Sequence, residues 1–177
     1  MRFLQSHMNN PSLIKHGIAV AAAMRAYARK FGEDEELWRI TGLLHDVDYE
    51  QFPDISEHGK RGGMWLEEAG YPAEVVHAVV AHNDYHQIPR DDLLSRALFA
   101  CDEITGLITA TALVRPEKKL AGLTSSTVRK KMKDKAFARG VNRNDIVAGA
   151  SELGVDLDTH IDFVIQAMTS EADALGL

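Results

Sequence analysis

The residues best suited to do chemistry are His45 and Asp46, which close the apolar run Leu43-Leu44-His45-Asp46-Val47-Asp48. A neutral imidazole nitrogen next to an anionic carboxylate oxygen suits a divalent transition metal. The pair alone is weak evidence, because a histidine at a helix end beside a solvated aspartate is common. Its interpretation therefore depends on whether other metal-binding residues lie at suitable positions in the chain.

Two further candidates lie on the inner faces of helical patterns. His16 shares a stripe with apolar residues of the first long helix, and His58 has the same geometry one turn into a later helix. A lone histidine on an apolar stripe is more often a hydrogen-bonded core residue than a ligand. Either histidine becomes a convincing metal ligand only if the fold brings it close to the other candidates.

The second half of the candidate set comes from residues 82–102. His82 and His86 are four residues apart, so both can face one ion on a helix. His82 is the predicted ligand, with His86 as its substitute. Asp102 lies in the middle of the most apolar segment, where a carboxylate is costly unless it is paired, hydrogen-bonded or bound to metal. The alternative for Asp102 is an ion pair with Arg96 or a distant lysine.

Hydrophobic periodicity predicts that helices position these residues. No alternating strand pattern exceeds a few residues, so the predicted fold class is all-α. Asn10, Ser56 and Asn142 are the predicted caps of three helices. The expected helices span residues 11–31, about 33–44, 56–70, from 72 to about 86, 89–113, 125–133, 142–153 and 158–175.

Length and composition predict one domain over residues 1–177, with its core in 10–115 and a basic segment and C-terminal helices in 116–177. A chain of 177 residues with 45% hydrophobic content can bury a core. The single cysteine, Cys101, excludes an intrachain disulfide and favours a reducing compartment, so a cytoplasmic location is expected. No apolar run is long enough for a membrane span.

Charge is unevenly distributed along the chain. Residues 115–143 carry ten Lys or Arg against two acidic residues, a balance of +8 within a net charge of −6, which leaves −14 for the rest. This pattern indicates a local cationic patch for a small anion or an acidic partner, or else a solvated basic helix. Nucleic-acid binding is disfavoured, because the net charge is negative and no aromatic residues interleave with the basic run.

The six candidates, in this order, resemble the HD superfamily of metal-dependent phosphohydrolases. The signature of that family is His, then His-Asp, then a distant Asp on a helical bundle, and the resemblance covers roughly residues 10 to 115. The core motif has Asp48 where the family has Gly. The resemblance implies that His16, His45, Asp46 and Asp102 hold one ion of iron, manganese, cobalt, nickel or zinc. It also implies a second ion on His58 and His82, bridged by Asp46.

The resemblance implies hydrolysis of a phosphate ester of a small metabolite or nucleotide. A metal brings its bound water to a pKa of about 7, so no protein nucleophile is required. Asp46 and Lys60 are the predicted catalytic residues, and phosphate contacts are expected from Lys60, Arg61, Lys118 and Lys119. Lys60 follows His58 closely, whereas Lys118 and Lys119 could act from a lid.

Two alternatives stay open, and one tempting match is discounted. The six-ligand, two-iron version of the fold also supports oxygenases, and a non-catalytic binding module would keep the fold with a structural metal or none. The tripeptide Gly70-Tyr71-Pro72 names a group of cyclic dinucleotide phosphodiesterases, but here a helix end followed by a helix start explains it. His7, His77 and His160 are predicted to be ordinary surface residues, and homodimerisation is left open.

Overall fold

The computed structural model describes residues 2–177, and this range is helical with no strand. The prediction of an all-α chain is therefore confirmed. The elements are α1 (Arg2–His7), α2 (Pro11–Phe31), α3 (Glu35–Leu44), α4 (Lys60–Glu68), α5 (Ala73–Ala81), the short 3₁₀ helix η1 (Asp84–His86), α6 (Leu93–Leu113), α7 (Ser125–Lys133), α8 (Arg143–Glu152), α9 (Leu157–Thr169) and α10 (Ala172–Leu175).

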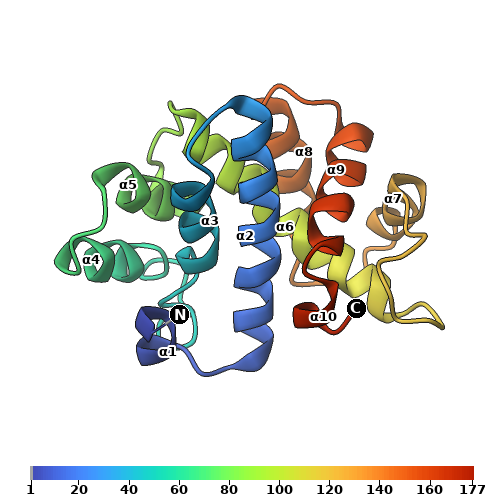
Figure 1. The fold of residues 1–177 in the computed structure, drawn as a ribbon, viewed down its shortest axis with the longest axis horizontal. Coiled ribbons are helices and arrows are strands. Elements are labelled where there is room, and N and C mark those ends of the chain that lie inside the picture. Colours follow the sequence, from blue (N-terminus) through green and yellow to red (C-terminus); the bar gives the residue numbers. More distant parts are fainter. Residues whose placement is uncertain (1) are drawn as a thin grey trace.

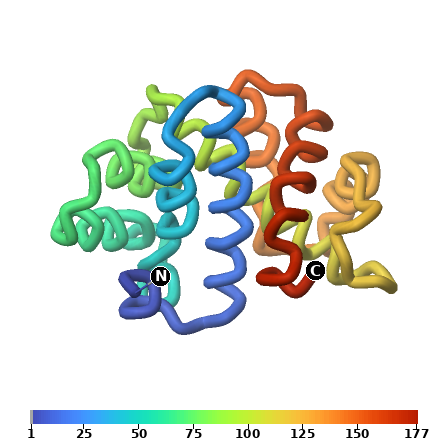
Figure 2. The backbone as a smooth tube through the Cα atoms, in the orientation of Figure 1, coloured from blue at the N-terminus to red at the C-terminus, as the bar shows by residue number. Residues whose placement is uncertain are grey.

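Two long helices organise the fold. α2 runs the height of the molecule at its centre, and α6 crosses behind it (Figure 1). α1, α3, α4 and α5 lie on one side of α2, and α7, α9 and α10 lie on the other, as the backbone trace also shows (Figure 2). Residues that are far apart in the sequence therefore meet where α2, α3 and α6 come together.

α2 and α3 approach each other closely at two glycines. A Cβ atom on Gly17 would lie 2.9 Å from the carbonyl oxygen of Leu43, and one on Gly42 would lie 2.9 Å from the backbone nitrogen of Ala21. Both distances are shorter than ordinary van der Waals contact. The two glycines thus set the spacing between the helices that carry His16 and His45.

Two apolar clusters hold the helices together. The larger one surrounds α6 and includes the inner faces of α2, α8 and α9. The smaller one packs α1, α3, α4 and α5 together around Val47 and Leu66. Burial of this apolar surface is the main favourable contribution to folding. No helix within residues 2–177 is both long enough and apolar enough to cross a membrane.

Polar side chains cap most of the helix starts. Asn10 and Asn142 accept backbone N–H bonds at the starts of α2 and α8, as predicted. The prediction for Ser56 is wrong, because the third predicted helix begins only at Lys60 and its N-cap, Gly59, makes no side-chain cap bond. His58 consequently lies in the turn that precedes α4 and not inside a helix.

Candidate metal centre

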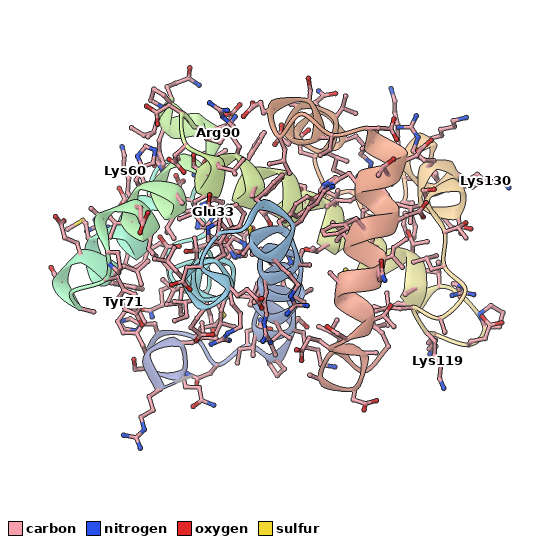
Figure 3. All side chains as sticks on the ribbon, turned by 45° about the horizontal axis from the view of Figure 1, so that its top comes forward. Glu33, Lys60, Tyr71, Arg90, Lys119 and Lys130 are labelled. Carbon is pink, nitrogen blue, oxygen red and sulfur yellow. The ribbon has the colours of Figure 1, made fainter. Side chains whose placement is uncertain are left out.

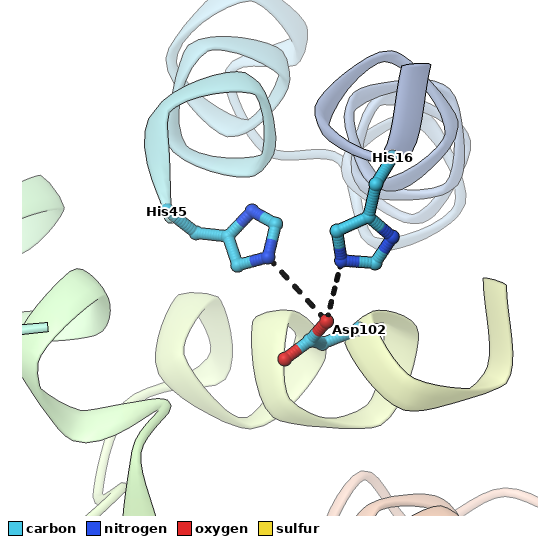
Figure 4. Close-up of side chains that lie close together, drawn as sticks. All are labelled: His16, His45 and Asp102. Atoms are coloured by element: carbon cyan, nitrogen blue, oxygen red, sulfur yellow. Dashed lines mark hydrogen bonds and ion pairs between the residues drawn. The ribbon is translucent and has the colours of Figure 1, made fainter. Parts of the chain in front are cut away.

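Six polar side chains from five separate parts of the chain converge on one place. His16 comes from α2, while His45 and Asp46 follow the end of α3. His58 precedes α4, His82 caps the C-terminal end of α5, and Asp102 lies in the middle of α6. Figure 4 shows His16 and His45 directed from two neighbouring helices towards Asp102 on the helix opposite.

Each carboxylate of this cluster faces several imidazoles. Asp102 Oδ1 lies 2.9 Å from His16 Nε2 and 3.4 Å from His45 Nε2. Asp46 Oδ1 lies 3.3 Å from Nε2 of both His45 and His58, and 3.6 Å from His82 Nε2. Asp46 Oδ2 reaches His16 Nε2 at 3.7 Å. Asp46 is thus the shared member of the cluster, next to all four histidines.

Hydrogen bonds at the far side of three rings orient the histidines. His45 Nδ1–H donates to the Gly42 carbonyl at 2.8 Å, and His82 Nδ1–H donates to the Val79 carbonyl at 2.5 Å. His58 Nδ1–H donates to Asp48 at 2.8 Å. In the neutral ring each Nε2 then carries a lone pair, and it points into the cluster.

These lone pairs fit a bound cation. Nε2 of His58 and Nε2 of His82 are 3.0 Å apart, which is unfavourable for two neutral acceptors unless a proton or cation lies between them. His45 Nε2 is buried and has no hydrogen-bond partner among residues 2–177. Possible donor atoms lie within 4.8 Å of one another in two overlapping groups, His16 with His45 and Asp102, and His45 with Asp46 and His82. Mixed nitrogen and oxygen donors suit a divalent transition metal.

The electrostatics of the cluster also favour positive charge. Burial disfavours a charged His45, but the carboxylates of Asp46 and Asp102 outweigh it and raise the pKa of His45 to about 9. Burial likewise opposes charge on His58, yet hydrogen bonds to Asp46 and Asp48 raise its pKa to about 10. Burial raises the pKa of Asp102, but the neighbouring imidazolium charges hold it well below its usual range. A divalent cation bound in the cluster would supply this positive charge in place of protons.

Two acidic residues near the cluster, Asp48 and Glu103, lie in environments that the sequence did not indicate. Asp48 is fully buried beside His58. Burial, together with the adjacent charge of Asp102, raises the pKa of Glu103 to about 8. Both residues are visible in the sequence, two positions after Asp46 and directly after Asp102. Nothing in the sequence shows that Asp48 is fully buried or that Glu103 is half-buried.

The predicted substrate contacts do not lie together. Lys60 is exposed directly after His58 and Gly59, with no ion pair among residues 2–177. Arg61 donates to Glu57 at 2.6 Å and lies over the ring of Phe52, so its charge is already engaged. Figure 3 shows Lys60 and Lys119 at opposite ends of the molecule.

The structure does not bring Lys118 and Lys119 to the cluster, so their action from a lid stays a prediction. α6 continues past Asp102 to Leu113, which corresponds to about 16 Å of helix. Both lysines follow beyond that end and are exposed. Both lysines therefore follow the end of α6 that points away from Asp102.

The other histidines fall into different environments. His86 Nε2–H donates to the His58 carbonyl at 2.7 Å, so His86 supports the loop that carries His58 and does not replace His82 in the cluster. His77 is half-buried, 3.3 Å from Asp92. The prediction of a surface His160 is wrong, because His160 is fully buried between the hydroxyl of Tyr27 (2.6 Å) and the carbonyl of Ala100 (2.8 Å).

Comparison with known proteins places this geometry in a family. The family described as "HD domain" matches residues 13–107, which is more than half of the chain and includes all six converging side chains. No solved structure matches the chain significantly.

Two curated relatives also match part of the chain. Ribonuclease Y of Oleidesulfovibrio alaskensis is 26% identical over 96 residues, which cover 54% of this chain and 18% of the relative. Ribonuclease Y of Fusobacterium nucleatum subsp. nucleatum is 31% identical over 74 residues, which cover 41% of this chain and 15% of the relative. The chain thus matches less than a fifth of the length of either protein.

Proposed function

Because this chain belongs to the HD domain family, we propose that it is a metal-dependent phosphohydrolase. The observation that supports this proposal is the convergence of four imidazoles and two carboxylates, with the lone pairs of His45, His58 and His82 directed at one another. His16, His45, Asp46 and Asp102 would hold one divalent ion. His58 and His82 would hold a second, which shares Asp46 with the first.

The chain's own residues then have distinct tasks. Bound divalent ions would supply an activated water and would stabilise the charge that develops during phosphoryl transfer. Asp46 faces every histidine of the cluster and is the residue that can join the two ions. His16 and Asp102 are the more solvent-accessible members, with side chains 23% and 21% exposed. A substrate therefore approaches from their side.

The substrate contact proposed for this chain is Lys60. A phosphate ester carries negative charge, and Lys60 is the exposed cation nearest along the chain to His58, with no competing ion pair among the described residues. Lys60 would bind the phosphate as a point charge. The proposed substrate class is a small phosphorylated metabolite or a nucleotide.

A phosphodiester is the second candidate substrate. The two curated relatives are ribonucleases by name, and they match 54% and 41% of this chain. The same set of ligands can serve a monoester or a diester, because two ions can stabilise both the attacking and the leaving oxygen. The choice between monoesterase and diesterase therefore needs a direct assay.

The test is metal analysis of protein purified without chelator, followed by hydrolysis assays. p-Nitrophenyl phosphate reports a monoesterase, while bis(p-nitrophenyl) phosphate and a short oligoribonucleotide report a diesterase. Asp46→Asn is expected to lower kcat/KM by more than about 100-fold, since it removes the carboxylate shared by both ions. Asp54→Asn is the matched control, because Asp54 is exposed and lies outside every group of possible metal ligands among residues 2–177.

Two results would refute the proposal. The phosphohydrolase proposal would be refuted if metal-loaded protein hydrolysed no nucleotide, sugar phosphate or phosphodiester. Two bound irons together with oxygen uptake and no phosphatase activity would favour the oxygenase alternative instead.

A further inference from the structure

A buried carboxylate stands directly behind one imidazole of the cluster. Asp48 is fully buried, and it accepts three hydrogen bonds. Its Oδ1 accepts from His58 Nδ1 at 2.8 Å, and its Oδ2 accepts from the backbone N–H groups of Gly59 at 2.8 Å and Gly62 at 2.7 Å. All of its hydrogen bonds therefore go either to one histidine or to the start of one helix.

The two backbone bonds fix the carboxylate in place. Gly59 is the N-cap of α4 and Gly62 lies in its first turn, so Asp48 Oδ2 satisfies N–H groups that would otherwise have no partner. A Cβ atom on Gly62 would lie 3.3 Å from Cγ and Oδ2 of Asp48, which is tighter than usual contact. The glycine thus lets the carboxylate sit against the helix end, and Oδ1 is left for His58.

His58 differs from the other oriented histidines in what holds its ring. His45 donates its Nδ1–H hydrogen bond to the main-chain carbonyl of Gly42, and His82 donates its own to the carbonyl of Val79. His58 alone among the three is held by a side chain. Because a carboxylate can only accept, the proton of a neutral His58 must lie on Nδ1, and Nε2 must present its lone pair to Asp46 and His82.

We infer that Asp48 is a positioning residue that keeps the proton of His58 on Nδ1 and thereby sets the affinity for the second divalent ion, the one bound by His58 and His82. This inference rests on the proposed function, since it concerns the same metal cluster. It assigns a task to the aspartate that stands where the family motif has glycine.

The isosteric variant Asp48→Asn gives a specific expectation. The amide oxygen can still accept the N–H bonds of Gly59 and Gly62, and this places the amide NH₂ against His58 Nδ1. The opposite orientation would leave two buried N–H donors facing an NH₂ group, at a cost of about 1–3 kcal/mol for each unsatisfied group. The first orientation is therefore favoured. In it His58 Nδ1 must accept a hydrogen bond from the amide NH₂, so the ring proton moves to Nε2. Nε2 then has no lone pair for a metal ion.

The experiment is Zn²⁺ titration by calorimetry, with metal counted after desalting, for the wild type, Asp48→Asn and Asp54→Asn. Asp54 is exposed on the same loop and bonds only to Ser56 through its side chain, so Asp54→Asn is the matched isosteric control. We expect two ions in the wild type and in the control. In Asp48→Asn the first ion is retained and the second binds about 10- to 100-fold more weakly.

A spectroscopic readout separates positioning from general damage. Long-range ¹H–¹⁵N NMR of the histidine rings in Zn²⁺-loaded protein should show His58 with its proton on Nδ1 in the wild type. In Asp48→Asn it should show the proton on Nε2. Equal binding of both ions by Asp48→Asn, or equal loss of both, would overturn the inference. If the wild type itself binds no divalent ion, the proposed function fails as well.

A second variant covers the case in which Asp48→Asn does not fold. Gly62→Ala introduces a Cβ atom in the first turn of α4, 3.2 Å from Cγ1 of Val47 and 3.3 Å from Cγ of Asp48, and alanine favours helix over glycine. It is expected to loosen the carboxylate and to weaken the second ion selectively, by less than Asp48→Asn. Folded Gly62→Ala protein with unchanged affinity for both ions would overturn the inference.

Discussion

The spacing between α2 and α3 can be tested by adding a single methyl group. In Gly42→Ala the new Cβ would lie 2.9 Å from the Ala21 nitrogen and from Cγ of Met24, and 3.0 Å from the Ala21 Cα. Ordinary carbon contacts are about 3.5–4.0 Å, so the helices must separate by roughly half an ångström or more. The clash with the backbone of Ala21 cannot be relieved by a side-chain rotation.

The expected magnitude follows from two opposing effects. Overpacking a well-packed interior costs about 1–3 kcal/mol, and a clash with backbone belongs at the upper end of that range. Alanine in a helix gains about 1 kcal/mol over glycine. Gly42→Ala should therefore lower the free energy of unfolding by about 1–2 kcal/mol. For a chain of this size that corresponds to a Tm lower by about 2–8 °C.

The matched control is Gly106→Ala in α6. A Cβ atom there meets only a methyl carbon of Val141, at an ordinary 3.6 Å. This variant should gain up to about 1 kcal/mol. Calorimetry or urea unfolding of both variants should thus show changes of opposite sign. If Gly42→Ala is as stable as Gly106→Ala, the close approach of α2 and α3 is not what the distances indicate.

Four further predictions concern the cluster, the buried Tyr27–His160 pair and the surface lysines. Zn²⁺ at 100 times its dissociation constant should stabilise the protein by about 2.7 kcal/mol and raise Tm by about 5–11 °C in thermal unfolding, an effect that excess EDTA reverses. Burial lowers the pKa of His160 below 6.5, so its contribution to stability is present above pH 6.5 and is lost as the pH falls below that value. Tyr27→Phe removes the donor to His160 and should cost about 1–3 kcal/mol at pH 7.5 by urea unfolding, with no loss if that hydrogen bond is unimportant. Lys60→Ala should raise KM for a phosphate ester, whereas Lys119→Ala should leave kcat/KM unchanged; equal effects in steady-state kinetics would contradict the placement of these lysines.

Local patterns in the sequence were sufficient for much of the fold. Asn10 and Asn142 cap the helices that they were predicted to cap, because the acceptor side chain and its N–H donor are only two residues apart. The prediction that Ser56 is a helix cap was wrong for the opposite reason. The acceptor at the start of α4 is Asp48, which lies 11 and 14 positions before its two donors. A search for local caps cannot find such a partner.

The same distinction explains what was foreseen at the cluster. Asp102 stood out in the sequence because a carboxylate in a long apolar helix needs a partner, and the structure places it against His16 and His45. The role of Asp48 as a hydrogen-bond acceptor for a ring depends on tertiary folding and was not foreseen. His160 was misplaced because its partner Tyr27 is 133 residues away.

The expected nearness of Lys118 and Lys119 to the cluster is not seen in the structure, for a different reason. Lys118 and Lys119 follow Asp102 by only a few turns of chain, and short separation in sequence suggested nearness in space. A straight helix carries the chain away from the cluster at about 1.5 Å per residue. Rigid helices therefore separate residues that a flexible connection could have kept together.

The larger apolar cluster has a practical consequence for anyone who wishes to shorten this protein. The family match stops at residue 107, yet Ile146, Ile161, Val164 and Met168 pack into the same interior as Leu98 and Ile104 of α6. A gene that encodes only the matched segment would give a polypeptide in which the apolar surface of α6 behind Asp102 is exposed to solvent. Such a fragment should precipitate or oligomerise on expression, so truncations for crystallisation or NMR need to retain everything through α10, whose Leu175 belongs to the same cluster.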